Sequence, residues 1–491
     1  MLTLLAYAIP YLFTVGLALG IAAAGVLQYR VAARLSPEFR ISATVLIVGI
    51  GALLSVALTS RTLDEDKIGT GMLIVTSDDL VGGFTASRWL SLFLVSVSMI
   101  EVARGWVRDR HDEVADPARG LLFAMLAYHL GTMFVQVTAS DHPGFSFRDL
   151  YVPIVLTAVY YQRPQSLAPI VSTARWTILA LTLGSLLAVR LRPDFAMHRP
   201  DPGWIPGLDW RLFGLAPHAN SLGPIALLGI LIELQFPSRW RALRWLGLLA
   251  SGSVFVLAQS KTAWGAVPVM LLFVALPLAL RGGLADGAGS FRRAVWTLSG
   301  AIAVIVTLAS ASVAFDAFDF IQGHSDLVTL TGRTQIWDIT LRAWRENMLF
   351  GYGPGIWGAE RQLQFHMFHV GHAHNQIVQS LGEAGLVGTL LLLLYLGALL
   401  RAALSRFVAS RGLVLLLLML VLVRCVTEAP MSRQGLLSWD AFLQVLLLAT
   451  ACHHVRRTRG EALGQGTRRR LADDEERAAP PGSSRFALRG V

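Results

Sequence analysis

The sequence is poor in charged residues, in cysteine and in lysine. Charged residues make up only 15% of its 491 residues, whereas soluble domains carry roughly a quarter. The two cysteines, Cys425 and Cys452, lie in apolar runs and by themselves form neither a disulfide framework nor a four-ligand metal site. Only Lys67 and Lys261 are lysines among 42 basic residues. The scarcity of charge argues against a water-soluble globular protein, and the rarity of lysine makes Lys261 conspicuous.

Hydrophobic residues are abundant, at 54% of the chain, and they occur in long runs. Since a helix that crosses a bilayer needs about 20 mostly apolar residues, the runs predict an all-α polytopic membrane protein with about 12–13 transmembrane helices. The run at 149–162 is short and bordered by tyrosines, which is typical of a tilted or partly interfacial segment. The candidate spans are residues 2–27, 41–59, 86–103, 120–138, 149–162, 175–190, 220–236, 244–260, 262–280, 294–314, 385–401, 412–427 and 436–454.

Basic residues alternate from one loop to the next and so predict the orientation. The positive-inside rule assigns the basic loops to the cytoplasm. Most of the net charge of +10 therefore fixes orientation, and we expect no nucleic-acid partner. The first run resembles a retained span, so residues 1–455 are expected to form a transmembrane domain, and residues 456–491 a disordered cytoplasmic tail. The basic clusters lie near residues 30–40, 104–119, 239–244, 281–293 and 401–411.

Two loops on the opposite, periplasmic side exceed a simple connection: residues 191–219 and 315–384. In the larger loop, apolar residues recur at helical spacing over residues 333–348, while charged residues fall elsewhere on the helical wheel. This pattern predicts an amphipathic helix, followed by a sharp glycine-rich turn at residues 351–355. We therefore expect a large, partly helical periplasmic loop before the third-last span, and expect both loops to carry the functional site.

Polar side chains gather at four places on the periplasmic side, each beside a predicted membrane edge. They are Arg211 with His218-x-Asn220, the run Gln259-Ser260-Lys261-Thr262, the run Gly332-Arg333-Thr334, and the run Gly371-His372-Ala373-His374-Asn375.

Taken singly, these residues have structural as well as functional interpretations. An outward arginine such as Arg211 or Arg333 can extend to lipid phosphate, and His374 can cap a helix instead of acting as a general base. Lys261 points more strongly to function, because a turn with no room for a loop holds its ammonium at the bilayer edge. Such a group is costly there unless it is paired or used.

Histidines are dense in the larger loop, and their spacing could supply metal ligands. No cysteine accompanies them, and the nearest carboxylates in sequence are Glu360 and Glu383. We therefore expect no bound metal and no cofactor. The histidines are His366, His369, His372 and His374.

Together and in order, the four places resemble the signature of the O-antigen ligase and polymerase superfamily, membrane glycosyltransferases that use polyprenyl-diphosphate sugars. The resemblance runs from about residue 205 to residue 390. It includes the turn at residues 351–353 and His374-Asn375, followed after nine residues by Gly385-x-x-Gly388. The runs Ser260-Lys261-Thr262 and Gly332-Arg333-Thr334-x-Ile336-Trp337 look more like the exopolysaccharide polymerase branch than the ligases, which commonly have arginine where Lys261 stands.

The resemblance implies an enzyme of the bacterial inner membrane that transfers a glycan from undecaprenyl diphosphate to an acceptor sugar hydroxyl at the periplasmic face. Arg211, Lys261 and Arg333 would hold the diphosphate and stabilise it as it leaves. His374 would remove the proton from the acceptor hydroxyl, and Asn375 would orient the histidine or the acceptor. A single displacement predicts inversion at the anomeric carbon without a metal. Membrane lipids and polysaccharide-assembly proteins are the further partners it implies.

Two alternatives remain open. A ligase that transfers finished glycan to lipid A core, or to a protein hydroxyl, uses the same chemistry, and the motifs barely separate it from a polymerase. A transporter or flippase of lipid-linked glycans would use the polar residues along a path. Transporters place ionisable groups near the bilayer midplane, whereas here they collect on the periplasmic side, with Glu233 the main exception within a span.

Overall fold

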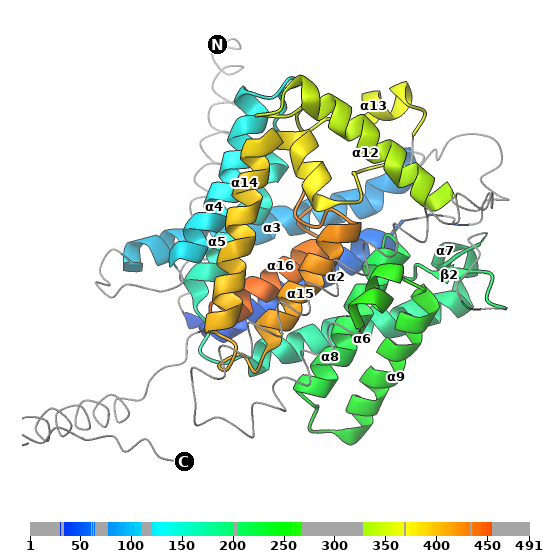
Figure 1. Cartoon of the computed structure of the whole chain (residues 1–491). Helices are drawn as coiled ribbons and strands as arrows, with labels where there is room; N and C mark the ends of the chain where they lie inside the picture. The colour runs from blue at the N-terminus through cyan, green and yellow to red at the C-terminus, as the bar shows by residue number, and fades with distance from the viewer. Residues whose placement is uncertain are drawn as a thin grey trace, which may run out of the picture. The chain divides into compact units, whose positions relative to one another are not determined.

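The computed structural model of the chain consists of α-helices, with one two-stranded antiparallel sheet in the part that it describes (Figure 1). Single residues 30, 61, 63 and 205 are described besides the continuous stretches. Those stretches are residues 34–59, 77–109, 119–199, 207–267, 328–367, 370–432 and 435–453.

Every predicted span that falls on described residues is a helix, so the all-α polytopic fold is confirmed. Residues 2–27, 294–314 and most of 262–280 lie outside the described residues, as does the predicted tail at 456–491. The helices are α2 (Pro37–Ala57), α3 (Ser77–Asp109), α4 (Arg119–Thr138), α5 (Tyr151–Gln162), α6 (Ala168–Leu191), α8 (Ala219–Gln235), α9 (Arg241–Ala258), α14 (Gln376–Ser405), α15 (Leu413–Thr427) and α16 (Trp439–Ala451).

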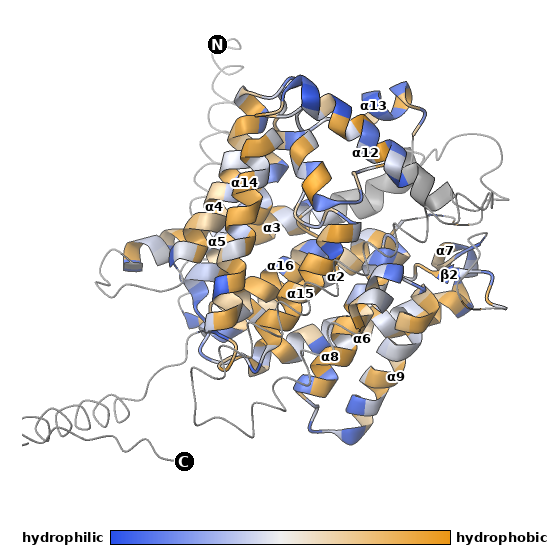
Figure 2. Cartoon of the chain, in the orientation of Figure 1, coloured by the Kyte–Doolittle hydropathy of each residue, from blue (hydrophilic) through white to orange (hydrophobic). Residues whose placement is uncertain are grey.

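Six of the described helices are long and apolar enough to cross a membrane, namely α2, α3, α4, α6, α9 and α14. The helices α8, α15 and α16 are apolar but shorter, and all 13 residues of α16 are buried. The predicted short run at 149–162 is α5, a helix of 12 residues that is buried over most of its length. Hydrophobic residues dominate these helices (Figure 2), and the short ones are covered by other helices rather than exposed along their whole length.

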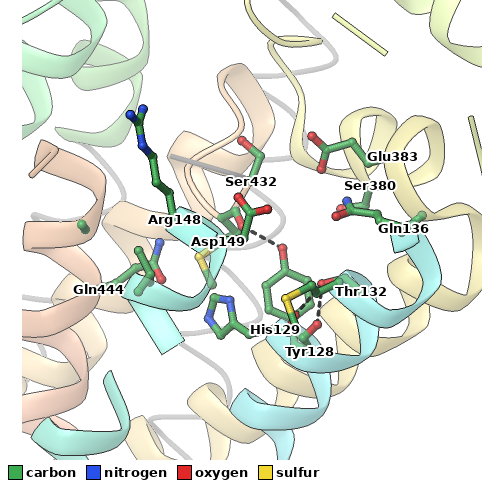
Figure 3. Close-up of a pocket in the computed structure, with 15 residues that line it drawn as sticks. Tyr128, His129, Thr132, Gln136, Arg148, Asp149, Ser380, Glu383, Ser432 and Gln444 are labelled. Carbon is green, nitrogen blue, oxygen red and sulfur yellow. Dashed lines mark hydrogen bonds between the residues drawn. The ribbon is translucent and has the colours of Figure 1, made fainter. Parts of the chain in front are cut away.

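Helix α14 packs along α4 and also contacts α12 and α15, while α8 packs against α9. A polar cavity, lined by residues of both helices, lies beside the contact of α4 with α14 (Figure 3). Helix α14 therefore connects the membrane-spanning helices to the larger loop.

The two large loops have structure of their own. In the first, α7 (Pro193–Ala196) leads into β1 (Met197–His198), which pairs with β2 (Arg211–Leu212) so that His198 lies opposite Arg211. The second contains α12 (Val328–Glu346) and α13 (Ala359–Gln364), so the predicted amphipathic helix is present. Residues of this loop, among them Ile336 and Trp357, form a small apolar core separate from the main one.

The glycine motifs of the larger loop and of α14 meet in one contact. Gly385 kinks α14 with φ of 61° and ψ of −156°, and the next two backbone N–H groups donate to the carbonyls of Met348 and Leu349 at 2.9 and 3.1 Å. A Cβ on Gly385 would lie 2.4 Å from the Leu349 carbonyl, and one on Gly351 would lie 2.7 Å from the Gly385 nitrogen. The backbones approach too closely for any other residue, and this contact fixes the loop against α14.

Candidate functional site

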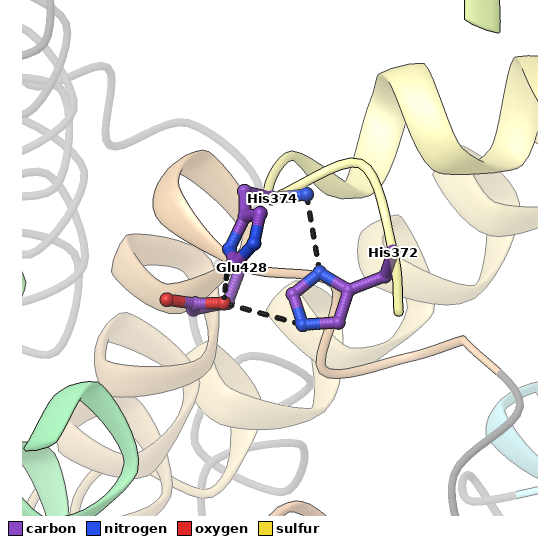
Figure 4. A group of neighbouring side chains, drawn as sticks. All are labelled: His372, His374 and Glu428. Carbon is purple, nitrogen blue, oxygen red and sulfur yellow. Dashed lines mark hydrogen bonds and ion pairs between the residues drawn. The ribbon is translucent and has the colours of Figure 1, made fainter. Parts of the chain in front are cut away.

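A buried carboxylate lies against two histidines of the larger loop (Figure 4). Oε2 of Glu428 is 3.0 Å from Nδ1 of His374 and 3.4 Å from Nε2 of His372. Nδ1 of His372 accepts the backbone N–H of His374 at 3.1 Å, so its Nε2 carries the proton that faces Glu428. An ionised carboxylate has no proton to donate, so Nδ1 of His374 is also a donor, and in the neutral imidazole Nε2 has the lone pair. His374 therefore presents a basic nitrogen on the side away from Glu428.

The backbone around His374 is held firmly. His374 has φ of +49°, in the left-handed region that is uncommon for a residue with a side chain. On its N-terminal side, the Ala373 carbonyl accepts the indole N–H of Trp337 at 2.8 Å, and the Ala373 N–H donates to Oε1 of Gln379 at 2.6 Å. On its other side, Asn375 caps α14. Helices α12 and α14 together impose the conformation that turns the imidazole toward Glu428.

Glu428 is the C-cap residue of α15 and is 7% exposed. Burial alone would raise the pKa of its carboxyl, but the hydrogen bond to His374 and the electrostatic effects of His374, His372 and Arg424 outweigh it, so the pKa lies well below its usual range. Oε1 of Glu428 also accepts the side-chain amide of Asn220 at 2.9 Å. The carboxylate is therefore ionised at neutral pH, and each of its two oxygens has a hydrogen-bond partner.

Asn220, at the start of α8, links the carboxylate to a cation. Its Oδ1 accepts a guanidinium N–H of Arg211 at 3.3 Å and the Ser260 hydroxyl at 3.3 Å. Its backbone carbonyl accepts from Arg424 at 2.8 Å, and Arg424 is paired with Asp440 at 2.6 Å. The chain of contacts thus runs from Arg211 through Asn220 and Glu428 to His374.

Arg211 is positioned by both the small sheet and the end of α9. Its strand pairs with β1, and its Nε donates to the Ala258 carbonyl at 3.4 Å. Gln259, which ends α9 in the left-handed conformation, donates to the Trp210 carbonyl at 2.9 Å and accepts from the Ile205 N–H at 3.1 Å. The loop at 191–219 is therefore attached to the turn that contains Ser260 and Lys261.

His372 is neutral at pH 7. Burial is the main cause that lowers its pKa from 6.5 to about 4, and the electrostatic effects of His374, Arg424 and Arg333 lower it further, against the opposing effect of Glu428. Arg333 thus acts electrostatically on this site from the first turns of α12. The pKa of His218 is likewise lowered from 6.5 to about 4, mainly by burial, and its Nδ1 accepts the Asn220 N–H at 3.1 Å and caps α8.

The remaining predicted site residues are Lys261 and Asn375. Lys261 has an exposed side chain and begins the helix that follows Ser260. Asn375 accepts the N–H groups of Ile377 and Val378 at 3.0 and 3.1 Å and donates to the Val426 carbonyl at 3.2 Å. Its side chain therefore binds α14 to the end of α15, which makes it a structural link beside His374.

Three of these groups could hold a divalent metal. The candidate ligand atoms of His372, His374 and Glu428 all lie within 4.8 Å of one another. Two neutral imidazoles and a carboxylate form a donor set that suits zinc. Of the other histidines proposed from the sequence, His366 belongs to the described residues but not to this group, and His369 lies outside them.

Glu428 and Arg424 were not predicted from the sequence. Glu428 follows an apolar run directly and precedes Ala429-Pro430, a position that is also ordinary for the end of a span. Arg424 lies within that run, and it is 1% exposed. An arginine inside a span with a carboxylate four residues later was the available signal, because buried charges in membrane proteins need partners.

Residues 246–393 match the family model described as O-antigen ligase. The matched stretch contains Lys261, Arg333, His374 and Asn375, but neither Arg211 nor Glu428. No curated protein matches the chain. The match supports the O-antigen ligase and polymerase superfamily and, in general, an enzyme of glycan transfer in a multi-pass membrane protein.

Proposed function

We propose that this protein is a glycosyltransferase that moves a glycan from an undecaprenyl-diphosphate donor to an acceptor sugar hydroxyl at the periplasmic face of the bacterial inner membrane, and so polymerises polysaccharide repeat units. The observation that carries the proposal is the contact chain Arg211–Asn220–Glu428–His374, which joins a cation to a general base. The O-antigen ligase match over residues 246–393 supports the same class of reaction.

The reaction is a single displacement. Nε2 of His374 takes the proton of the acceptor hydroxyl, and the hydroxyl oxygen forms a bond to the anomeric carbon of the donor. The bond from that carbon to the diphosphate oxygen breaks, and the electron pair leaves with the diphosphate, so the configuration inverts. Glu428 stabilises the imidazolium that forms, because its carboxylate is held on Nδ1.

Positive charge receives the leaving diphosphate. We assign this role to Arg211, Lys261 and Arg333, since arginine binds phosphate oxygens in bidentate fashion and lysine acts as a compact charge. Helix α8 begins at this site, and the positive end of the helix dipole adds to the attraction for an anion. No step requires a metal or a covalent glycosyl-enzyme intermediate.

Two of the buried carboxylates within the described spans, Glu233 and Glu101, argue against a transport path, whereas Glu383 of α14 lines the cavity beside α4. Glu233 is paired with Arg175 at 2.5 Å, and Glu101 with Arg40 and Arg104 at 3.3 and 3.0 Å. Each is neutralised by an arginine of the protein itself, whereas the groups with solvent access belong to the loops. This distribution favours chemistry at one face over passage of a charged substrate.

The testing experiment compares wild-type protein with His374→Ala, both purified in detergent with a polyprenyl-diphosphate-linked glycan. We expect glycosidic bond formation by the wild type and none by the variant at equal thermal stability. Activity in folded His374→Ala would remove this histidine from the base role, and absence of transfer by the wild type would favour a flippase. In cells that lack the protein, accumulation of single repeat units supports a polymerase, whereas long lipid-linked chains missing from the core indicate a ligase.

A further inference from the structure

The polar cavity beside the contact of α4 with α14 also lies near the candidate site. It is lined by α4, the short 3-10 helix η2 (Phe147–Leu150), the start of α5, α14, α16 and residues 431–432 (Figure 3). Imidazole, amide, carboxylate, hydroxyl and guanidinium groups lie on its wall. Among the residues that carry them are His129, Gln136, Asp149, Glu383 and Gln444.

The cavity has the size of a small polar ligand. Its empty volume, open solvent at the mouth included, is about 740 Å³. That volume lies in the range of small-molecule pockets, roughly 300–1,000 Å³, and one sugar ring fits within it.

Polar atoms on the wall lack protein partners. Nε2 of His129 and Oε1 of Gln444 are fully enclosed, and neither makes a hydrogen bond with any residue the structure describes. Gln136, which is 4% exposed, lines the same wall. Buried polar groups without partners are costly, so these atoms indicate a bound polar molecule.

The charges of the wall select the kind of molecule. Asp149, Glu383 and one basic residue, Arg148, line the cavity. Two carboxylates disfavour a diphosphate, but they accept hydrogen bonds from hydroxyl groups well. Amide side chains such as Gln136 and Gln444 both donate and accept, which suits a hydroxyl that does the same. A polyhydroxylated, uncharged group fits this wall.

Both members of the His374–Glu428 pair are tied to the cavity. Oε1 of Glu383 accepts the side-chain amide of Gln379 at 2.9 Å, and Oε1 of Gln379 accepts the N–H of Ala373, next to His374, at 2.6 Å. On the other side, Met431 lines the cavity three residues after Glu428, and its N–H donates to Oε1 of Gln376 at 2.8 Å. The wall of the cavity therefore continues into the loop that positions the base.

We propose that this cavity binds one sugar residue of the acceptor glycan, while the donor diphosphate lies at Arg211, Lys261 and Arg333. The inference rests on the proposed glycosyl transfer. It assigns donor and acceptor to different elements on either side of the His374–Glu428 pair.

Two variants of α4 test the cavity in the full-length purified protein. Gln136→Leu is nearly isosteric, and His129→Phe keeps the ring that packs on Tyr128 and Tyr395. Thr138→Val is the matched control, because it removes a hydroxyl from the same helix outside the cavity. We expect each cavity variant to raise the KM for the acceptor about tenfold or more, with the donor KM within about twofold of wild type. The control leaves both unchanged.

Direct binding separates this inference from the proposed function. The probe is the oligosaccharide repeat unit released by mild acid from the cell's own surface polysaccharide, measured by saturation-transfer NMR on wild type, Gln136→Leu and His374→Ala. Binding that survives in His374→Ala and is lost in Gln136→Leu supports the cavity, even if no transfer is detected and the proposed function fails. If transfer depends on His374 but acceptor KM and binding are unchanged in both folded cavity variants, the cavity is not the acceptor site. The proposed function then stands without it.

Discussion

Nδ1 of His374 lies 3.0 Å from Oε2 of Glu428, across 54 positions of sequence. The contact joins the entrance of α14 to the exit of α15, and it leaves Nε2 of His374 as the basic atom. A base that is oriented on one nitrogen by a carboxylate is preorganised to take a proton on the other. The relationship makes Glu428 a positioning residue for the proposed reaction.

Glu428→Gln should slow transfer mainly through kcat. An amide cannot stabilise the imidazolium as a carboxylate does, so we expect kcat to fall about 10²- to 10⁴-fold with little change in either KM. Glu428→Asp should recover part of the loss, because it keeps the charge. Glu360→Gln, an exposed carboxylate on α13, is the matched control. Wild-type kcat in folded Glu428→Gln would contradict the role.

Asn220→Asp should destabilise the protein in a pH-dependent manner. The pKa of Glu428 is lowered, so its ionised form contributes stability above pH 4.5, and this contribution is lost as the pH falls. The variant places a second carboxylate where an amide donated at 2.9 Å, which raises the pKa of one partner, and its penalty therefore grows as the pH rises. We expect a loss of about 2–4 kcal/mol at pH 8, and less at pH 5.

Thermal unfolding in detergent at both pH values checks this, with Gln364→Glu, an exposed amide of α13, as control. A penalty for Asn220→Asp that is the same at pH 5 and pH 8 would show that the two carboxylates do not interact.

The helices were predictable because each depends on its own residues. A run of apolar residues has only one way to satisfy its backbone in a membrane, so α2, α4 and α6 follow from composition alone. Helix α12 was predictable for a similar reason, since its apolar face recurs at helical spacing. The run at 149–162 was correctly identified as short, and it forms a helix of 12 residues that is buried over most of its length.

The partners of the site residues were not predictable, because they depend on which helix ends meet. Glu428 follows an apolar run and looks like any span terminus until α8 brings Asn220 and the larger loop brings His374 against it. Asn375 shows the converse difficulty. The sequence allowed it to orient the histidine or the acceptor, but in the fold its amide caps α14 and bonds to Val426, a use that only the three-dimensional arrangement reveals.

Arg333→Gln should raise the pKa of His372 from about 4 toward 6.5. Burial is the larger cause of the lowered pKa and remains, so the rise is partial, but removing a nearby positive charge favours the imidazolium. Carbon-13 NMR of labelled histidine in detergent micelles measures the titration. Arg345→Gln, at the other end of α12, should leave the pKa of His372 unchanged. An unchanged titration in Arg333→Gln would mean that this arginine does not act on the site.

Chelation and zinc addition should have opposite effects. The proposed displacement uses no metal, so EDTA should leave the rate unchanged. Added zinc should inhibit, because His372, His374 and Glu428 offer ligand atoms within 4.8 Å and coordination would occupy the base. His372→Ala should weaken the inhibition by about tenfold or more, as one ligand is lost. Loss of activity in EDTA that zinc restores would instead establish a metal-dependent enzyme.

Gly385→Ala should prevent α14 from forming its contact with the larger loop. Gly385 has positive φ, and a Cβ there would lie 2.4 Å from the Leu349 carbonyl. Backbone strain alone costs about 1–3 kcal/mol, and the clash with fixed backbone adds to it. Because the same contact holds the segment that leads to His374, transfer should fall together with the melting temperature.

Gly397→Ala is the matched control on the same helix, since nothing lies within 4 Å of a Cβ at that position. Alanine is favoured over glycine inside a helix by up to about 1 kcal/mol, so this variant should be as stable as wild type or slightly more so. Differential scanning fluorimetry of both proteins in detergent measures the difference. Equal melting temperatures for Gly385→Ala and Gly397→Ala would mean that the kink is not required, and that the glycine motif serves some other purpose than close approach of the two backbones.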